Sequence, residues 1–186
     1  MAPNIGKSSL ASLELVEAGR QLPEHRRHPH SGAASSDRIA ALLENVQMFK
    51  DLEWPQIEML SGYIQVYRAA PGAILFREGD RGDFMCIVLE GKLEIRKKDQ
   101  RNVDKTVATA LPGRSLGEMT IVDGEPRSAT AVAVSPSLLA VLTQENFLQI
   151  MRDKPALSAK LLLKIAQLLS QRLRLTSGIL VDYLES

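Results

Sequence analysis

The central part of the chain alternates between apolar and polar residues in short runs that are separated by turn sequences. From Tyr63 to Leu142, the runs either alternate between apolar and polar residues, as in 63–67 and 92–97, or are continuously apolar, as in 84–89, and polar bends, most of which contain glycine or proline, interrupt them. A period of two is typical of β-strands that are buried on one face. Many short strands with regularly spaced turns favour a sandwich or barrel, here a β-roll or jelly-roll of about eight antiparallel strands. The predicted strands cover residues 63–67, 73–76, 84–89, 92–97, 103–110, 128–134 and 138–142.

The segments on either side of this β region have a helical period. Apolar residues recur at helical spacing from Ile39 to Val46, and Pro55 suits the first turn of a second helix. A long helical pattern begins at Pro155 and is apolar on more than one face, so part of it is expected to need a partner. The predicted fold class is therefore α+β, with N-terminal helices and a long C-terminal helix.

We expect three segments along the chain. Residues 1–36 lack strong periodicity and end in a polar stretch rich in helix breakers, which predicts a flexible tail. All three histidines lie in this tail, at His25, His28 and His30. The helical lead-in and the β-roll are assigned to residues 37–154, and the C-terminal lid or dimerisation helix to residues 155–186.

Composition argues against several classes of protein. The formal net charge is +1, whereas nucleic-acid-binding domains are usually basic. The single cysteine, Cys86, lies in an apolar run, which indicates a buried thiol in a reducing compartment. No stretch is apolar enough to span a bilayer, and the start has no leader pattern, so we expect a cytoplasmic protein. Without a histidine or a Gly-x-Ser-x-Gly motif in the folded part, we expect no catalytic residues, no metal site and no enzyme.

Residues 116–130, with the sequence LGEMTIVDGEPRSAT, combine features that suit a phosphate ester. A helix that opens at Gly117 would present unpaired backbone N–H groups to an anion, and glycine allows close approach of a ligand. Arg127 offers a planar fork of donors that matches two phosphate oxygens. Glu118 accepts hydrogen bonds only, so beside a phosphate it suits a sugar hydroxyl. The stretch therefore predicts a site for a small phosphate ester with a free hydroxyl.

The same residues resemble the phosphate-binding cassette of cyclic-nucleotide-binding domains. This family includes the regulatory subunit of protein kinase A, cyclic-nucleotide-gated channels and the sensor domain of the catabolite activator protein. Its pattern is Gly-Glu-apolar, a short turn, then Arg-(Ala/Ser/Thr)-Ala, which is similar to residues 117–119 and 127–129 here. The resemblance covers about residues 38–184 and implies the family's β-roll.

The resemblance also implies roles for individual residues. Arg127 would pair with the exocyclic phosphate oxygens, and Glu118 would accept from the ribose 2′-hydroxyl. Backbone N–H groups near Met119 and Ala129 and the hydroxyl of Ser128 would add donors to the phosphate. The expected phosphate and ribose site consists of Gly117, Glu118, Met119, Arg127, Ser128 and Ala129.

Four further residues are expected to read the base. Ile95 and Val107 are strand positions expected to face it. Thr176 and Ser177 resemble the Thr-Ser pair of the catabolite activator protein, which contacts the adenine amino group there. Ser128 does not decide between guanine and adenine. The resemblance of Thr176 and Ser177 to the adenine-contacting pair therefore favours cAMP over cGMP. The expected ligand is therefore cAMP, and no further cofactor is expected.

Two alternatives stay open. Arg114 and Ser115 stand where the family usually has an acidic residue, and the extra positive charge leaves cyclic di-GMP as another ligand. A ligand-free interaction module of the same fold is the second alternative.

The C-terminal helix is the expected route of signalling. Its seam alternates steps of three and four, as a two-helix coiled coil requires, and so predicts a homodimer. Movement of this helix would report to an effector protein that the sequence does not name. About ten residues follow Thr176, so we expect no DNA-binding domain and no direct DNA binding, and we also expect no membrane partner. The seam residues are Ala166, Leu169, Leu173, Thr176, Leu180 and Tyr183.

Overall fold

A computed structural model describes residues 10, 13–16 and 35–184. These residues fall into two compact units, Met1–Phe147 and Leu148–Ser186, which are described separately. The division lies within α4 (Gln144–Asp153) rather than before Pro155, where the sequence placed the start of the C-terminal segment.

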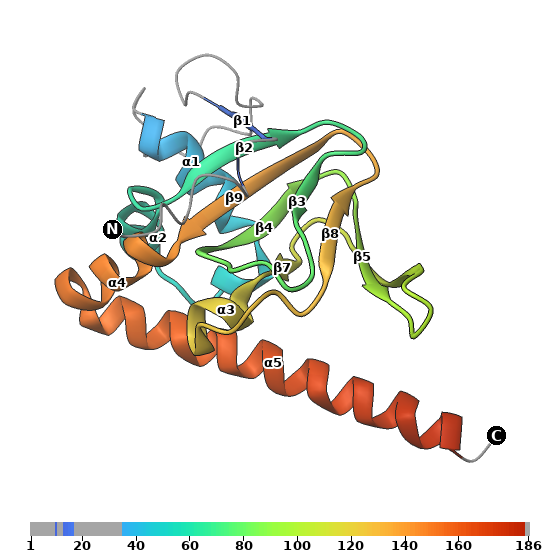
Figure 1. The fold of residues 1–186 in the computed structure, drawn as a ribbon. Helices are drawn as coiled ribbons and strands as arrows, with labels where there is room; N and C mark the ends of the chain where they lie inside the picture. Colours follow the sequence, from blue (N-terminus) through green and yellow to red (C-terminus); the bar gives the residue numbers. More distant parts are fainter. Residues whose placement is uncertain (1–9, 11–12, 17–34, 185–186) are drawn as a thin grey trace, which may run out of the picture. The chain divides into compact units, whose positions relative to one another are not determined.

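The first unit is built on two antiparallel sheets (Figure 1). One has the strand order β1-β2-β9-β4-β7 and the other the order β3-β8-β5-β6. Residues from both sheets form one buried cluster, so the sheets pack face to face, and the predicted α+β jelly-roll is confirmed. The strands are β1 (Glu14–Leu15), β2 (Gln65–Ala69), β3 (Ile74–Phe76), β4 (Phe84–Glu90), β5 (Leu93–Lys98), β6 (Asp104–Ala110), β7 (Ser115–Leu116), β8 (Thr130–Ala133) and β9 (Ser137–Thr143).

Alternation along the strands selects the residues of this core. Leu93 and Ile95 of β5 pack in the cluster beside Ala131 and Ala133 of β8, with which they are in register. The small side chains of β8 leave room for larger ones from β3 and β4. On its other side β5 pairs with β6, where Ile95 lies opposite Ala108. The register between β5 and β6 shifts by one residue immediately after this pair.

Two strands lie where the sequence did not predict them. β7 is only two residues long and pairs Leu116 with Cys86 of β4. β1 adds to the edge of the larger sheet, where Leu15 pairs with Tyr67, and Val16 beside it is buried. The expected flexible tail of residues 1–36 thus includes a short segment, residues 14–16, that pairs with β2 or lies buried beside it. The three histidines of the expected tail lie outside the described residues.

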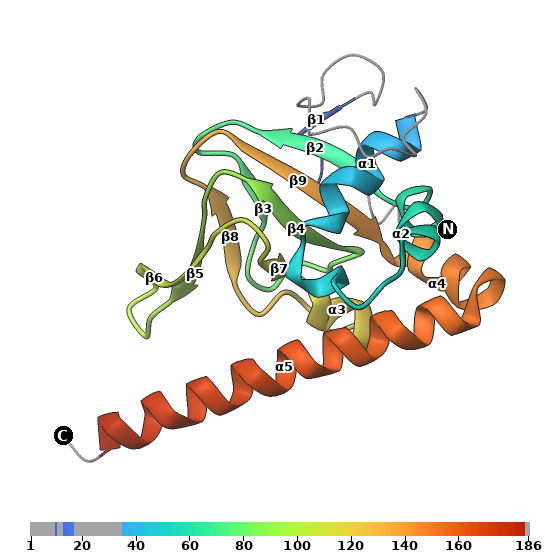
Figure 2. The same ribbon diagram turned by 180° about the vertical axis from the view of Figure 1, so that it is seen from behind.

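Three helical segments of the first unit lie between β1 and β2 in the chain. They are α1 (Ser35–Glu44), the 3-10 turn η1 (Gln47–Phe49) and α2 (Trp54–Ser61), and α1 and α2 lie beside the larger sheet in both views (Figure 1; Figure 2). Pro55 occupies the first turn of α2, as predicted, and a reciprocal capping box of Glu53 and Gln56 satisfies the start of the helix. These helices confirm the helical lead-in.

The C-terminal helices follow β9. Thr143 caps α4, because its Oγ1 accepts a hydrogen bond from the N–H of Asn146 over 3.1 Å. Pro155 then begins α5 (Pro155–Leu184), a helix of 30 residues that confirms the predicted long C-terminal helix. None of the helices within residues 35–184 has a window long and apolar enough to cross a membrane.

Candidate functional site

The cassette folds as a short helix between two strands. After β7, Gly117 adopts φ +77° and caps α3 (Glu118–Asp123) without a side-chain bond. At the other end Gly124 adopts φ +71°, and its N–H donates to the carbonyl of Thr120 over 3.0 Å. Both backbone angles lie in the left-handed region, which glycine enters at little cost. The two glycines therefore fix the helix at both ends and direct the following loop, with Arg127, back toward β8.

The side chain of Arg127 turns into the protein. It is 3% exposed, and its Nη2 donates to the carbonyl of Phe84 over 2.7 Å. Its Nη1 donates to the carbonyl of Gly117 over 3.2 Å. The guanidinium also lies over two aromatic rings, with its Cζ 4.3 Å from the ring centre of Phe76 and 4.6 Å from that of Phe84.

Two glycines make room for this guanidinium. A Cβ on Gly117 would lie within contact distance of Nη1 of Arg127, and a Cβ on Gly82 would meet Nε. Gly117 was expected to admit a ligand to the backbone. In the structure, a Cβ on Gly117 would meet Nη1 of Arg127, so the absence of a side chain there also makes room for this guanidinium, while approach of a ligand to the backbone stays a prediction.

Burial makes Arg127 electrostatically unusual. Loss of water lowers the pKa of its guanidinium, while nearby Cys86, Asp83, Glu118 and Asp80 act in the opposite direction. Among the described residues Arg127 forms no salt bridge, and its buried Nε has no hydrogen-bond partner. A buried cation without an anionic partner is costly, and an anion brought to it would recover part of that cost.

The other cassette residues surround Arg127 at different depths. Glu118 is 1% exposed, and Ala129 is also buried. Met119 and Ser128 face solvent, and the hydroxyl of Ser128 lies 3.8 Å from the sulfur of Met119. The structure thus brings the predicted phosphate and ribose residues together in one cassette, with the two charged side chains inside and the serine outside.

The expected base-reading residues are less closely grouped. Ile95 is half-buried against the core of the first unit, whereas Val107 is 56% exposed at the register shift of β6. Thr176 and Ser177 belong to α5 in the second unit, where each hydroxyl donates to its own helix backbone over 2.9 Å. Their contact with a base stays a prediction.

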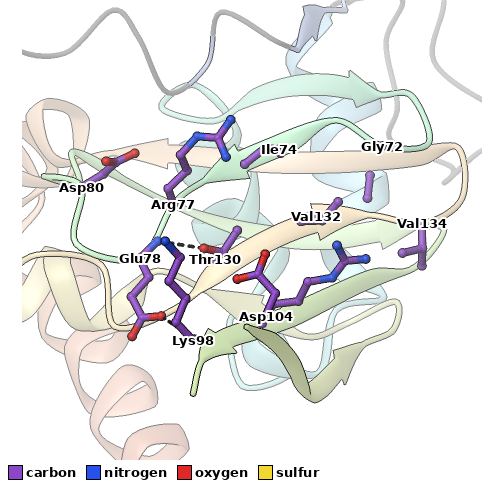
Figure 3. Close-up of a pocket in the computed structure, with 12 residues that line it drawn as sticks. Gly72, Ile74, Arg77, Glu78, Asp80, Lys98, Asp104, Thr130, Val132 and Val134 are labelled. Atoms are coloured by element: carbon purple, nitrogen blue, oxygen red, sulfur yellow. Dashed lines mark hydrogen bonds between the residues drawn. The ribbon is translucent and has the colours of Figure 1, made fainter. Parts of the chain in front are cut away.

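A separate cavity of about 510 Å³ lies over β3, β8 and β5 and contains none of the predicted ligand residues (Figure 3). Figure 3 shows Asp80 and Arg77 at one end, and Gly72 and Val134 at the other. Glu78 closes one side, where its N–H donates to Thr130 over 2.9 Å. The charged residues that line the cavity are evenly divided by sign, so it offers no single-sign site for a phosphate. They are Arg77, Arg96 and Lys98, and Glu78, Asp80 and Asp104.

Sequence reasoning missed the residues that hold Arg127. Phe76, Gly82 and Phe84 lie in β3, in the loop before β4 and at the start of β4, and Phe84 is 43 positions from Arg127. No local pattern joins them to the cassette. Within the described parts of the chain, no group of His, Cys, Asp and Glu side chains could hold a metal ion.

Comparison with known proteins identifies the family. The model of the cyclic nucleotide-binding domain matches residues 66–154. The crystal structure of a cyclic nucleotide-binding domain from Methylobacillus flagellatus is 30% identical, has a TM-score of 0.71, and aligns over 80% of this chain and 83% of its own. The cyclic AMP receptor protein of Thermus thermophilus is 32% identical over 127 residues, which are 68% of this chain and 57% of that protein.

A third relative is the cAMP-dependent protein kinase regulatory subunit of Blastocladiella emersonii, which is 30% identical over 116 residues. The match covers 62% of this chain and 29% of the subunit, so the chain spans only part of the length of these two curated relatives. The family match includes β2 to β9 and the whole cassette. The chain therefore belongs to the cyclic nucleotide-binding domain family.

Proposed function

We propose that the chain is a receptor for cAMP that binds the nucleotide through the cassette of residues 116–130 and has no catalytic activity of its own. The observation that carries this proposal is Arg127, a buried cation with no salt bridge to any described residue and with an unused Nε donor. A singly charged cyclic phosphate would supply the missing anion.

The cassette residues supply distinct contacts in this proposal. Arg127 binds the exocyclic phosphate oxygens, and Glu118 accepts from the ribose 2′-hydroxyl. Backbone N–H groups at Met119 and Ala129 donate to the phosphate, and the exposed hydroxyl of Ser128 adds a donor at the mouth of the site. No cofactor beyond the nucleotide takes part.

The choice of cAMP over cGMP rests on two kinds of support. The two curated relatives described above carry cyclic AMP in their names, and Thr176 and Ser177 match an adenine-reading pair in sequence. In the proposed complex Ile95 and Val107 contribute apolar contacts to the base. The hydroxyls of Thr176 and Ser177 would then exchange their helix carbonyls for the adenine.

Signalling is assigned to α5. Its second half exposes large apolar side chains, which is unusual for a helix that functions alone. We propose that two copies pair through this helix, that cAMP changes its position, and that an effector protein in the cytoplasm detects the change. The exposed residues include Leu173, Leu175, Ile179 and Val181, while the side chains of Leu180 and Tyr183 in the predicted seam lie outside the described residues.

Titration calorimetry of the full chain with cAMP, cGMP and cyclic di-GMP tests the ligand. We expect cAMP to bind most tightly, and Arg127→Gln to weaken binding on the order of a hundredfold, because truncating one partner of a buried charge pair costs ~2–5 kcal/mol. Tighter binding of cyclic di-GMP would replace the ligand but keep the site. No binding of any of the three would leave a protein-interaction module of the same fold.

Hydrogen exchange and sedimentation test the signalling. Added cAMP should change amide protection within residues 156–184, and the chain should sediment as a dimer. Equal protection with and without cAMP would contradict movement of α5, and a monomer would contradict pairing through it.

A further inference from the structure

Two aromatic rings outside the cassette enclose the guanidinium of Arg127. Phe76 comes from β3 of one sheet and Phe84 from β4 of the other, and both rings are almost fully buried, at 6% and 0% exposed. The rings meet edge to face, with centres 6.1 Å apart and planes at 65°. Arg127 lies within cation–π distance of each of them.

These contacts hold a cation that water does not reach. Attraction between a cation and an aromatic face is strongest where water is excluded. Among the described residues, the guanidinium of Arg127 has few other partners, since its hydrogen bonds there go to the carbonyls of Phe84 and Gly117. The two rings are therefore a main reason why the guanidinium can stay inside the protein without a salt bridge to a described residue.

The same contacts fix the direction of the donor fork. A guanidinium has five N–H donors, and two of them are used on carbonyls, which leaves three. The rings restrain the guanidinium plane, and Gly82 borders Nε on a further side. A donor group held in one orientation before the ligand arrives loses less entropy when it binds.

We propose that Phe76 and Phe84 are positioning residues for the phosphate anchor, acting on the ligand through Arg127. This inference rests on the proposed function. In it, Arg127 stays between the rings when the ligand is bound, and its remaining donors face the anion. The rings thus set ligand affinity although neither touches the nucleotide.

The test compares Phe76 variants of the full chain by cAMP titration. Phe76→Leu keeps the apolar character and removes the ring, while pentafluorophenylalanine at position 76 keeps the ring and reverses its charge distribution. Phe76 is the better target because its carbonyl is not used by Arg127. Phe49→Leu is the matched control, since this ring is equally buried and is not one of the two that lie over Arg127.

We expect both changes at position 76 to weaken cAMP binding about tenfold, and Phe49→Leu to leave it unchanged. The fluorinated variant separates the two roles of the ring, because filling space does not depend on the ring's charge distribution. If Phe76→Leu does not fold, the fluorinated variant alone provides the test.

If the fluorinated variant folds and binds cAMP as tightly as the wild type, the inference is overturned. The proposed function would still stand in that case, because the wild-type chain binds cAMP. Tighter binding would overturn the inference as well, since the rings would then compete with the ligand for Arg127. Failure of the wild-type chain to bind cAMP would overturn both the function and the inference.

Discussion

A single methyl group at Gly82 should displace the guanidinium of Arg127. The Cβ of Gly82→Ala would lie 2.4 Å from Nε and 2.5 Å from Cζ of Arg127, and 2.9 Å from Cγ2 of Thr120. Ordinary carbon contacts are about 3.5–4.0 Å, so the guanidinium must retreat by about 1 Å. The backbone angle of Gly82 lies outside the left-handed region, so an alanine would act there mainly through its volume.

The retreat breaks contacts that can be estimated. Each hydrogen bond from a charged donor contributes ~1.5–3 kcal/mol, and the ring contacts about 1–2 kcal/mol. Rehydration of the displaced guanidinium offsets part of this loss, and alanine lowers the entropy of the unfolded chain by the equivalent of ~0.4–1 kcal/mol. We therefore expect Gly82→Ala to lower the free energy of unfolding by about 2 kcal/mol and to weaken cAMP binding at least tenfold.

Urea denaturation and calorimetry measure both effects. Gly62→Ala is the matched control, because Gly62 has φ −66° and its added Cβ would lie 3.5 Å from the carbonyl of Met59. That variant should bind cAMP like the wild type and be at least as stable. If Gly82→Ala matches Gly62→Ala in both measurements, Arg127 does not occupy the space beside Gly82 and the reasoning fails.

Three further predictions concern Gly117, Glu118 and Cys86. Gly117→Ala should destabilise the fold by about 2 kcal/mol or more in urea denaturation, because φ +77° and contact with Arg127 both oppose a side chain; wild-type stability would contradict the geometry. Glu118→Gln should bind cAMP more weakly but bind 2′-deoxy-cAMP like the wild type does, and equal losses for both nucleotides would remove the ribose role. Burial raises the pKa of Cys86 to about 12, above its ordinary value of 9.0, so the stability this group contributes is complete below pH 9 and is lost as pH rises toward 12. Cys86→Ala should flatten this alkaline decline in denaturation experiments, and an unchanged slope would assign it to other groups.

Much of the fold follows from local sequence. Alternation and turn residues located the strands from β2 to β6 and β8 and β9, because side-chain direction in a strand depends only on neighbouring positions. β7 was missed because two residues carry no period, and β1 because its pairing with β2 is a contact between distant segments. The start of α2 was predicted from Pro55, whose fixed φ acts within one turn.

The candidate site, like the fold, could be predicted from the sequence only in part. The order and spacing of Gly117, Glu118 and Arg127 determined the cassette and its family, since these residues are close in the chain and their chemistry is specific. The sequence predicted that Arg127 offers its donor fork to a phosphate, but it did not indicate which side chains hold the guanidinium. Only the packing of the two sheets brings Phe76 and Phe84 together and leaves a space beside Gly82, and this space directs the guanidinium inward. The direction of Arg127 is a tertiary property because its stabilising contacts come from separate strands and loops, which meet only when the core has formed.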